Sequence, residues 1–229
     1  MKNKERRPIG RAATACIAAW LAATLTSAFA ETTLGQQMAT GGNAKGVPAC
    51  IGCHGAAGQG NADAGFPRLA GLSSSYLDAQ LAAFADGSRK SAVMQPIASH
   101  LTASERTAVA NYFSTLSLPQ GIRSSDPSDP LPSDTGAWLA TRGRWKDNLP
   151  ACAQCHGPAG AGVGSVFPSL AGQPAGYIET QLHEWKAGAR PAGPLALMPA
   201  VASKLSDVDM YAVAEYYAQP AQISETRAK

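Results

Sequence analysis

Hydrophobic and polar residues recur at helical spacing in two matching stretches of the 229-residue chain. In the range 75–86, aromatic and aliphatic residues recur with helical periodicity, and Gly87 follows as a helix stop. The range 175–187 repeats this arrangement and ends before Gly188. No segment has the convincing alternation of a half-buried strand, so the pattern predicts an all-α protein.

Two further helices are predicted from their first residues. Thr102 and Glu105 have the spacing of a capping box, in which each side chain accepts a hydrogen bond from the backbone N–H of the other residue. Ser206 and Asp209 hold the corresponding positions before a second helix, as a weaker version of the motif. Short amphipathic segments ahead of positions 50 and 152 predict one more helix in each half of the chain.

The chain after residue 30 is a tandem repeat. The strings Pro-Ala-Cys, Cys-His-Gly, Phe-Pro-X-Leu-Ala-Gly and Ala-Val-Ala recur in the same order, at offsets of 101 to 104 residues. Such repetition predicts two copies of one structural unit. We expect domains over residues 31–118 and 137–229, joined by an exposed linker over 119–136 that is rich in Pro, Ser and Asp. Each unit, of about 90 residues, is small for an apolar core of its own.

The most specific motif is Cys-X-X-Cys-His, which occurs once in each half. Its residues are Cys50, Cys53 and His54 in the first copy and Cys152, Cys155 and His156 in the second. This spacing is typical of c-type haem attachment, in which two thiols bond to the vinyl groups of one haem and the histidine binds iron from one side. The duplicated motif predicts two covalently bound haem c groups, which would also supply buried surface to each small unit.

A zinc site, a redox dithiol and a structural disulfide are the competing interpretations of the cysteine pairs. Zinc needs about four protein ligands near one metal, whereas these pairs lie 102 residues apart and each has its own histidine. A thioredoxin-like dithiol would need a strand–helix context, and none is visible. All four cysteines after residue 30 belong to the motifs. Haem attachment is therefore favoured.

The first thirty residues have the pattern of a secretory signal peptide. A basic start precedes an apolar stretch from Ala12 to about Leu25, and Ala28-Phe29-Ala30 is a small-X-small cleavage site. The apolar stretch is short for a membrane span, so we expect cleavage after Ala30 and export to the periplasm. An uncleaved N-terminal anchor is the alternative.

Removal of this segment reverses the sign of the net charge. The full chain has 19 basic and 16 acidic residues, a formal +3, and residues 1–30 contain five basic and one acidic residue. The remaining chain therefore has 14 basic against 15 acidic residues, a net −1. The basic pI belongs largely to the export segment, and the mature charge does not predict nucleic-acid binding.

The repeat also selects candidates for the second axial ligand of each iron, because a ligand used twice should recur at matching positions. Met94 and Met198 do so at an offset of 104, each expected in a loop before the last helix of its half. Pro96 and Pro199 follow closely, which suits a non-helical ligand loop. Methionines that only fill gaps in the core are the alternative.

Other conspicuous side chains have less specific assignments. His100 and His183 have no histidine at the matching position of the other half, so a surface or packing role is expected. Arg89 and Arg190 follow the glycine that ends each middle helix, where they could pair with haem propionates or lie at the surface. Four tyrosines are expected in the core, some of them against haem: Tyr76, Tyr112, Tyr177 and Tyr216.

The repeated strings resemble the tandem two-haem class I cytochromes c of the cytochrome c4 type. The matching pieces are Cys-X-X-Cys-His-Gly, Pro-X-Leu-Ala-Gly, Tyr-X-X-X-Gln-Leu and a methionine loop before an Ala-Tyr helix, in both halves. The resemblance implies two all-α domains, each wrapped around one haem, packed as a pseudo-twofold pair with propionate edges near their interface. It also implies His/Met-ligated iron and periplasmic electron transfer.

The expected function is electron transfer between redox proteins, not catalysis. With both axial positions filled, neither iron has a vacant site for a substrate. The implied partners are a quinol–cytochrome c reductase, a haem-copper terminal oxidase or a periplasmic dehydrogenase, and peripheral membrane association is compatible with them. Two alternatives stay open: a diheme redox enzyme of cytochrome peroxidase or thiosulfate dehydrogenase type, and a haem subunit fixed to a periplasmic dehydrogenase.

Overall fold

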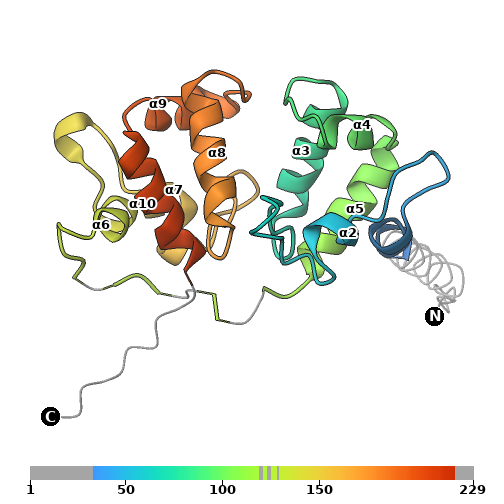
Figure 1. The fold of residues 1–229 in the computed structure, drawn as a ribbon, viewed down its shortest axis with the longest axis horizontal. Coiled ribbons are helices and arrows are strands. Elements are labelled where there is room, and N and C mark those ends of the chain that lie inside the picture. The colour runs from blue at the N-terminus through green and yellow to red at the C-terminus, as the bar shows by residue number, and fades with distance from the viewer. Residues whose placement is uncertain (1–32, 119–120, 123–124, 128, 220–229) are drawn as a thin grey trace, which may run out of the picture.

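The protein consists of two helical halves joined by a segment that runs along one edge of both (Figure 1). The computed structural model describes residues 33–118, 121–122, 125–127 and 129–219. The expected signal peptide, residues 1–30, and its cleavage site lie outside the described residues. Within the described ranges the secondary structure is helical apart from isolated β-bridges in loops, so the predicted all-α fold is confirmed. No helix in these ranges is long and apolar enough to cross a membrane.

The two halves contain the same succession of α-helices, to which the second half adds the short 3-10 helices η1, η2 and η3. In the first, a helix over residues 33–41 is followed by α2 (Ile51–His54), α3 (Ser74–Ala85), α4 (Met94–Ser99) and α5 (Ala103–Thr115). In the second, the order is α6 (Thr135–Thr141), η1 (Trp145–Asp147), α7 (Ala153–His156), η2 (Pro158–Gly160), α8 (Ala175–Lys186), η3 (Pro194–Ala196), α9 (Leu197–Ala202) and α10 (Asp207–Ala218). The predicted middle helices match α3 and α8 to within one residue at each end, and the expected first helices are present.

Local sequence signals explain where the middle helices begin and end. The Ser73 side chain accepts a hydrogen bond from the backbone N–H of Tyr76 and caps α3. The helix ends at Ala85, just before Gly87, whose φ of +77° is a left-handed conformation that favours glycine. The inward face of α3 buries Leu77 and Phe84.

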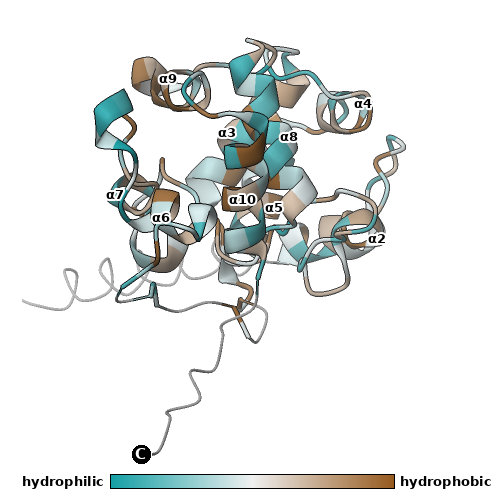
Figure 2. Cartoon of the chain, turned by 60° about the vertical axis from the view of Figure 1, so that its left-hand side comes forward, coloured by the Kyte–Doolittle hydropathy of each residue, from teal (hydrophilic) through white to brown (hydrophobic). Residues whose placement is uncertain are grey.

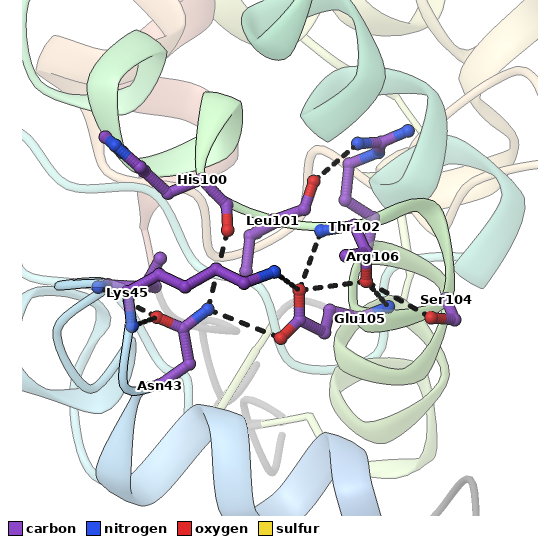
Figure 3. A network of polar contacts seen from close by, with 9 residues as sticks. Asn43, Lys45, His100, Leu101, Thr102, Ser104, Glu105 and Arg106 are labelled. Atoms are coloured by element: carbon purple, nitrogen blue, oxygen red, sulfur yellow. Dashed lines mark hydrogen bonds and ion pairs between the residues drawn. The ribbon is translucent and has the colours of Figure 1, made fainter.

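Both predicted capping boxes are present, and their acidic residues also hold a distant loop. Glu105 accepts hydrogen bonds from the Thr102 backbone N–H at 2.7 Å and from the Asn43 side chain at 3.3 Å (Figure 3). Lys45 lies 3.9 Å from the same carboxylate. Asn43 belongs to the loop that leads to the first cysteine motif, so the cap of α5 fixes the entry to that motif.

The second half makes the same connection with a charged partner. Asp209 accepts from the Ser206 backbone N–H at 2.9 Å and from the Arg144 guanidinium at 3.0 and 3.1 Å. Arg144 holds the position that Asn43 has in the first half, one residue after the matching glycine. The neutral amide donor of the first half is thus replaced by a guanidinium, which forms a half-buried ion pair in the second.

Each half has its own apolar core, built from the inward faces of its helices. In the first half the buried hydrophobic residues are Met38, Ala39, Val47, Leu72, Leu77, Leu101, Val109, Ala110 and Phe113. In the second half they are Ala137, Leu139, Ala140, Leu149, Ile178, Leu182, Ala202, Leu205, Met210, Val213, Ala214, Tyr216 and Tyr217. Tyr216 therefore lies in the core as expected.

The two halves face each other along their middle helices, α3 and α8 (Figure 1). A view turned by 60° shows hydrophilic as well as hydrophobic residues on both helices (Figure 2). Arg89 donates to the Tyr177 hydroxyl at 3.1 Å, and Arg190 donates to the Tyr76 hydroxyl at 3.1 Å. Each contact is the repeat-related copy of the other, which is the reciprocity of a twofold arrangement.

The described part of the segment between the halves is largely exposed, but some of its residues contact the second half. The Asp126 carboxylate accepts hydrogen bonds from the Ala159 backbone N–H and from the Tyr216 hydroxyl, both at 2.7 Å. Pro130 is buried. These contacts attach the described part of the segment to the second half. They also compensate the Asp126 carboxylate for the hydration that it loses on burial.

Candidate functional site

Each Cys-X-X-Cys-His motif forms a single helical turn, α2 in the first half and α7 in the second. Cys50 and Cys152 are the N-cap residues of these turns. The second cysteine of each pair lies three residues further on, and residues at that spacing are neighbours on one helix face. Gly55 and Gly157 follow the histidines with φ of +84° and +77°, a conformation that lets the chain leave the turn sharply.

The motif histidines are buried, and one nitrogen of each ring is already engaged. Nδ1 of His54 lies 2.8 Å from the carbonyl oxygen of Pro67, and Nδ1 of His156 lies 2.8 Å from that of Pro168. A carbonyl can only accept, so Nδ1 carries the proton and Nε2 keeps its lone pair. Burial lowers the pKa of both imidazoles, which favours the neutral form that binds metal.

The cysteine thiols are free and form no metal cluster with other side chains. The four motif cysteines are unpaired, so the described residues form no disulfide. Across the part of the chain that the structure describes, no group of three or more His, Cys, Asp or Glu side chains could hold a metal ion, which argues against zinc. Burial raises the pKa of Cys50 and of Cys152 to about 11, so both thiols are neutral in the bare polypeptide.

The predicted methionines lie at the starts of short helices, not in open loops. Met94 is the first residue of α4, and Met198 is the second residue of α9. The loop prediction, based on Pro96 and Pro199, was wrong for a physical reason. Both prolines occupy the first helical turn, where their missing N–H groups need no intrahelical partner.

One apolar cavity of about 880 Å³ brings these residues together. Its lining includes the motif cysteines and histidines of both halves, together with both candidate methionines: Cys50, Cys53, His54, Met94, Cys152, Cys155, His156 and Met198. A cavity of this size and lining is within the range of large cofactor sites. Neither His100 nor His183 lines it, as expected from their lack of a repeat partner.

The residues around the cavity fit haem c. Each half supplies two thiols for covalent attachment, a neutral imidazole and a thioether, the donor set of a His/Met cytochrome site. Arg68 and Arg89 line the same cavity, and the Nε–H of each is buried without a hydrogen-bond partner among the described residues. Buried donors of this kind suit the carboxylates of a haem.

Arg89 and Arg190 are buried, which contradicts the surface role, one of the two alternatives left open by the sequence. Their side chains are 5% and 7% exposed. The Arg89 guanidinium lies 4.4 Å from the ring centroid of Phe84, and that of Arg190 lies 3.9 Å from the ring centroid of Trp185. Pairing with propionates stays a prediction.

Sequence reasoning missed the polar residues that join the two halves. Gln80 accepts from Arg89 at 2.7 Å and from Arg190 at 3.1 Å. Gln181 accepts from the same two arginines at 2.5 and 2.9 Å. Both glutamines belong to the repeated Tyr-X-X-X-Gln-Leu string, which was available as a signal. Arg68 has no arginine at the matching position of the second half and left no such signal.

Two family models match the chain, one in each half. Residues 34–117 match the model described as Cytochrome c, and residues 139–216 match the one described as Cytochrome C oxidase, cbb3-type, subunit III. Both halves are therefore cytochrome c units, and the prediction of two covalently bound haem c groups is confirmed.

The relatives define the class more closely. The chain is 34% identical to cytochrome c4 of Pseudomonas aeruginosa over 78% of its own length and 86% of the relative. It belongs to the diheme class I cytochromes c of the cytochrome c4 type, as the sequence predicted. The crystal structure of cytochrome c4 from Pseudomonas stutzeri matches with a TM-score of 0.66 and 33% identity, over 75% of this chain and 93% of that one.

Two relatives with a more specific name are more similar to this chain than the cytochrome c4 of Pseudomonas aeruginosa is. Proteins named "Thiosulfate dehydrogenase electron acceptor" are 48% identical in Thiomonas intermedia and 44% identical in Stutzerimonas stutzeri. These alignments cover 74% and 89% of this chain, and 77% and 94% of the relatives. A solved structure of a thiosulfate dehydrogenase from Marichromatium purpuratum is 43% identical to this chain, with a TM-score of 0.74. The match covers 82% of this chain but only 40% of that protein.

Proposed function

We propose that the protein is a periplasmic carrier that passes electrons between redox proteins and does not itself transform a substrate. The observation that supports this best is the apolar cavity into which each half brings two cysteines, one histidine and one methionine. Haem iron supplies the chemistry when bound, a one-electron change between the ferric and ferrous states. The apolar lining keeps water from the site and favours the less charged ferrous state.

The axial ligands proposed for the two irons are repeat-related. Cys50 and Cys53 hold one haem, and Cys152 and Cys155 hold the other. His54 and His156 each offer a free Nε2, because the proline carbonyls orient their rings through Nδ1. Met94 and Met198 offer thioether sulfur as second axial ligands. Filled axial positions leave no place for a small substrate, which separates a carrier from a peroxidase or dehydrogenase.

The proposed boundaries place one haem in each domain. We assign residues 31–118 and 137–229 to the two cytochrome domains, and residues 119–136 to the connecting segment. Residues 1–30 are assigned to a signal peptide cleaved after Ala30, on the strength of the small-X-small site. Covalent haem attachment on the exported side of the membrane agrees with this route.

The proposed electron donor is a thiosulfate dehydrogenase. This donor is supported by the identities of 48% and 44% to proteins named as acceptors for that enzyme, which exceed those to cytochromes c4. It belongs to the dehydrogenase class of partner expected from the sequence. A haem-copper terminal oxidase is the proposed acceptor. The net charge of −1 after residue 30 favours brief encounters without very strong electrostatic steering.

The test uses mature holoprotein purified from the periplasm, with two haems per chain verified by a pyridine haemochrome assay. Oxidised protein is mixed with thiosulfate, with and without a purified thiosulfate dehydrogenase, and its visible absorption is followed. We expect fast reduction only when enzyme and thiosulfate are both present. Sustained oxidation of thiosulfate by the cytochrome alone would contradict the carrier assignment. If thiosulfate dehydrogenase does not reduce the cytochrome but another periplasmic dehydrogenase does, the proposed donor is wrong.

A further inference from the structure

Arg68 breaks the repeat at the point where the two halves meet. The string Phe-Pro-X-Leu-Ala-Gly has arginine at its third position in the first half and Ser169 in the second. The Arg68 side chain is 0% exposed and is among the largest side chains that are completely buried. A buried guanidinium is costly to desolvate, so its partners must compensate for lost hydration.

Most of those partners belong to the other half. One terminal nitrogen of Arg68, Nη2, donates to Ser169 Oγ at 3.0 Å and to the carbonyl oxygen of Ala171 at 2.9 Å. The other, Nη1, donates to the carbonyl of Ala70 within its own half. The Arg68 backbone is held as well, because Gln173 accepts from its N–H at 3.0 Å and donates to its carbonyl at 2.9 Å.

These contacts include no protein side chain of opposite charge. Its side-chain acceptors in the described part of the chain are backbone carbonyls and one hydroxyl, and no carboxylate is among them. Burial lowers the pKa of Arg68 to about 10, which still leaves the guanidinium protonated at neutral pH. Within the described polypeptide, only dipoles stabilise this buried cation, and its unpartnered Nε–H stays available to a haem carboxylate.

Arg68 is connected to both residues whose carbonyls orient the motif histidines. Pro67, whose carbonyl accepts from His54, is the residue before Arg68. Pro168, whose carbonyl accepts from His156, is the residue before Ser169, which Arg68 contacts directly. Arg68 also lines the haem cavity. Arg68 thus follows Pro67 in sequence and contacts the residue that follows Pro168, so it is linked to the carbonyl that orients each motif histidine.

We propose that Arg68 is a positioning residue shared by both haems, which raises both reduction potentials and holds the two histidine segments in one fixed arrangement. The inference rests on the proposed ligation by His54 and His156. Oxidation adds one positive charge at the iron, and a buried cation nearby opposes that charge more strongly than a solvated one would. Because the guanidinium bridges the halves, the effect reaches both irons and not only the one in its own domain.

The decisive variant is Arg68→Met, which keeps an unbranched side chain and removes the charge. Spectroelectrochemical titration of the two-haem protein should show both potentials lowered. We expect the equilibrium constant for reduction of each haem to fall about tenfold, which is about 59 mV for a one-electron couple. The matched control is Lys146→Gln, which removes an exposed cation and should change either constant by less than about twofold.

Ionic strength distinguishes a buried charge from a surface effect. The shift caused by Arg68→Met should persist when salt is raised, whereas any small shift from Lys146→Gln should shrink. A purely structural role predicts loss of stability with both potentials unchanged. Unchanged potentials, or a change at one haem only, in folded Arg68→Met protein would overturn the proposal.

A second variant covers the case in which Arg68→Met does not fold. The exchange Arg68→Ser with Ser169→Arg moves the guanidinium to the repeat-related position, from which twofold symmetry directs it back to the same interface. It should retain two haems, and both reduction equilibrium constants should stay within about threefold of the parent. A folded exchange protein with both potentials strongly lowered would contradict the shared role. The titration needs no partner protein, so its outcome is independent of the thiosulfate assay.

Discussion

At the scale of single residues, the two haem sites use the same contacts twice. His54 and His156 each meet a proline carbonyl at 2.8 Å, and a phenylalanine ring lies 5.9 and 6.2 Å from the two imidazole centroids. The candidate methionines are half-buried in both halves and line the common cavity. Because each half keeps its own set, a substitution in one should leave the spectrum of the other haem intact.

If Met94 and Met198 are the ligands, each substitution should affect the signals of one haem only. Met94→His and Met198→His should each remove about half of the weak near-infrared sulfur-to-iron charge-transfer band of the oxidised protein. Each should also lower one of the two potentials, because a thioether favours ferrous iron more than imidazole does. Spectroelectrochemical titration with a near-infrared spectrum checks both effects.

A matched control exists in the same protein. Met210 is 0% exposed and does not line the cavity, so Met210→Leu should keep the whole band and both potentials. If Met94→His or Met198→His also keeps the full band, the ligand at that iron is a different residue.

At the scale of helices, the last helix of each half holds the loop that leads to its cysteine motif. The connection runs through the acidic residue of the capping box, which is the third residue of the helix: Glu105 in α5 and Asp209 in α10. Burial alone would raise the pKa of Asp209, but hydrogen bonds from Arg144 and Ser206 outweigh it, and the pKa is lowered. Stability gained from this carboxylate is therefore present above its ordinary pKa, and is lost as pH falls through the lower folded value.

This arrangement predicts a stability loss specific to Asp209. Asp209→Asn should lower the free energy of unfolding by about 1–2 kcal/mol at neutral pH, because it weakens the contact to Arg144 and the helix cap. The decline of stability below about pH 4 should be shallower than in the parent. Denaturant unfolding followed by far-UV circular dichroism at several pH values measures both.

The neighbouring Asp207 provides the control for charge at a helix start. Its side chain is 80% exposed and lies 3.7 Å from Lys186. Asp207→Asn should change stability by less than about 0.5 kcal/mol, since exposed ion pairs contribute little. Equal losses in the two variants would show that general helix-end charge, and not the Arg144 contact, stabilises this half.

At the scale of the whole molecule, the features that could be predicted from the sequence are those that recur in both halves or have a fixed residue spacing. The two haem c groups followed from the spacing of the cysteine motifs, and α3 and α8 followed from periodicity. The short helices that carry Met94 and Met198 were missed, because proline was read as a helix breaker although the first turn tolerates it. Arg68 was missed because its acceptors lie 101 and 103 residues away, a distance that no local pattern encodes.

A closed polar ring links the two halves across their interface. Gln80 and Gln181 each accept from both Arg89 and Arg190. Buried donors in such a network depend on every acceptor, since a guanidinium left short of a partner carries the full cost of its lost hydration. The two halves should therefore unfold as one unit while the ring is intact.

Replacement of one acceptor tests this cooperativity. Gln181→Leu removes the oxygen that Arg89 and Arg190 share, and leaves each arginine with one glutamine acceptor in place of two. We expect the free energy of unfolding to fall by about 2 kcal/mol and the single transition to separate into two, since each half has its own core. Denaturation followed in parallel by far-UV circular dichroism and by Soret absorption resolves the steps. Gln37→Leu, at an exposed position on the helix over residues 33–41, should keep the parent's single transition. A Gln181→Leu protein with one unshifted transition would mean that the ring contributes little, and that the arginines are satisfied by the haem carboxylates instead.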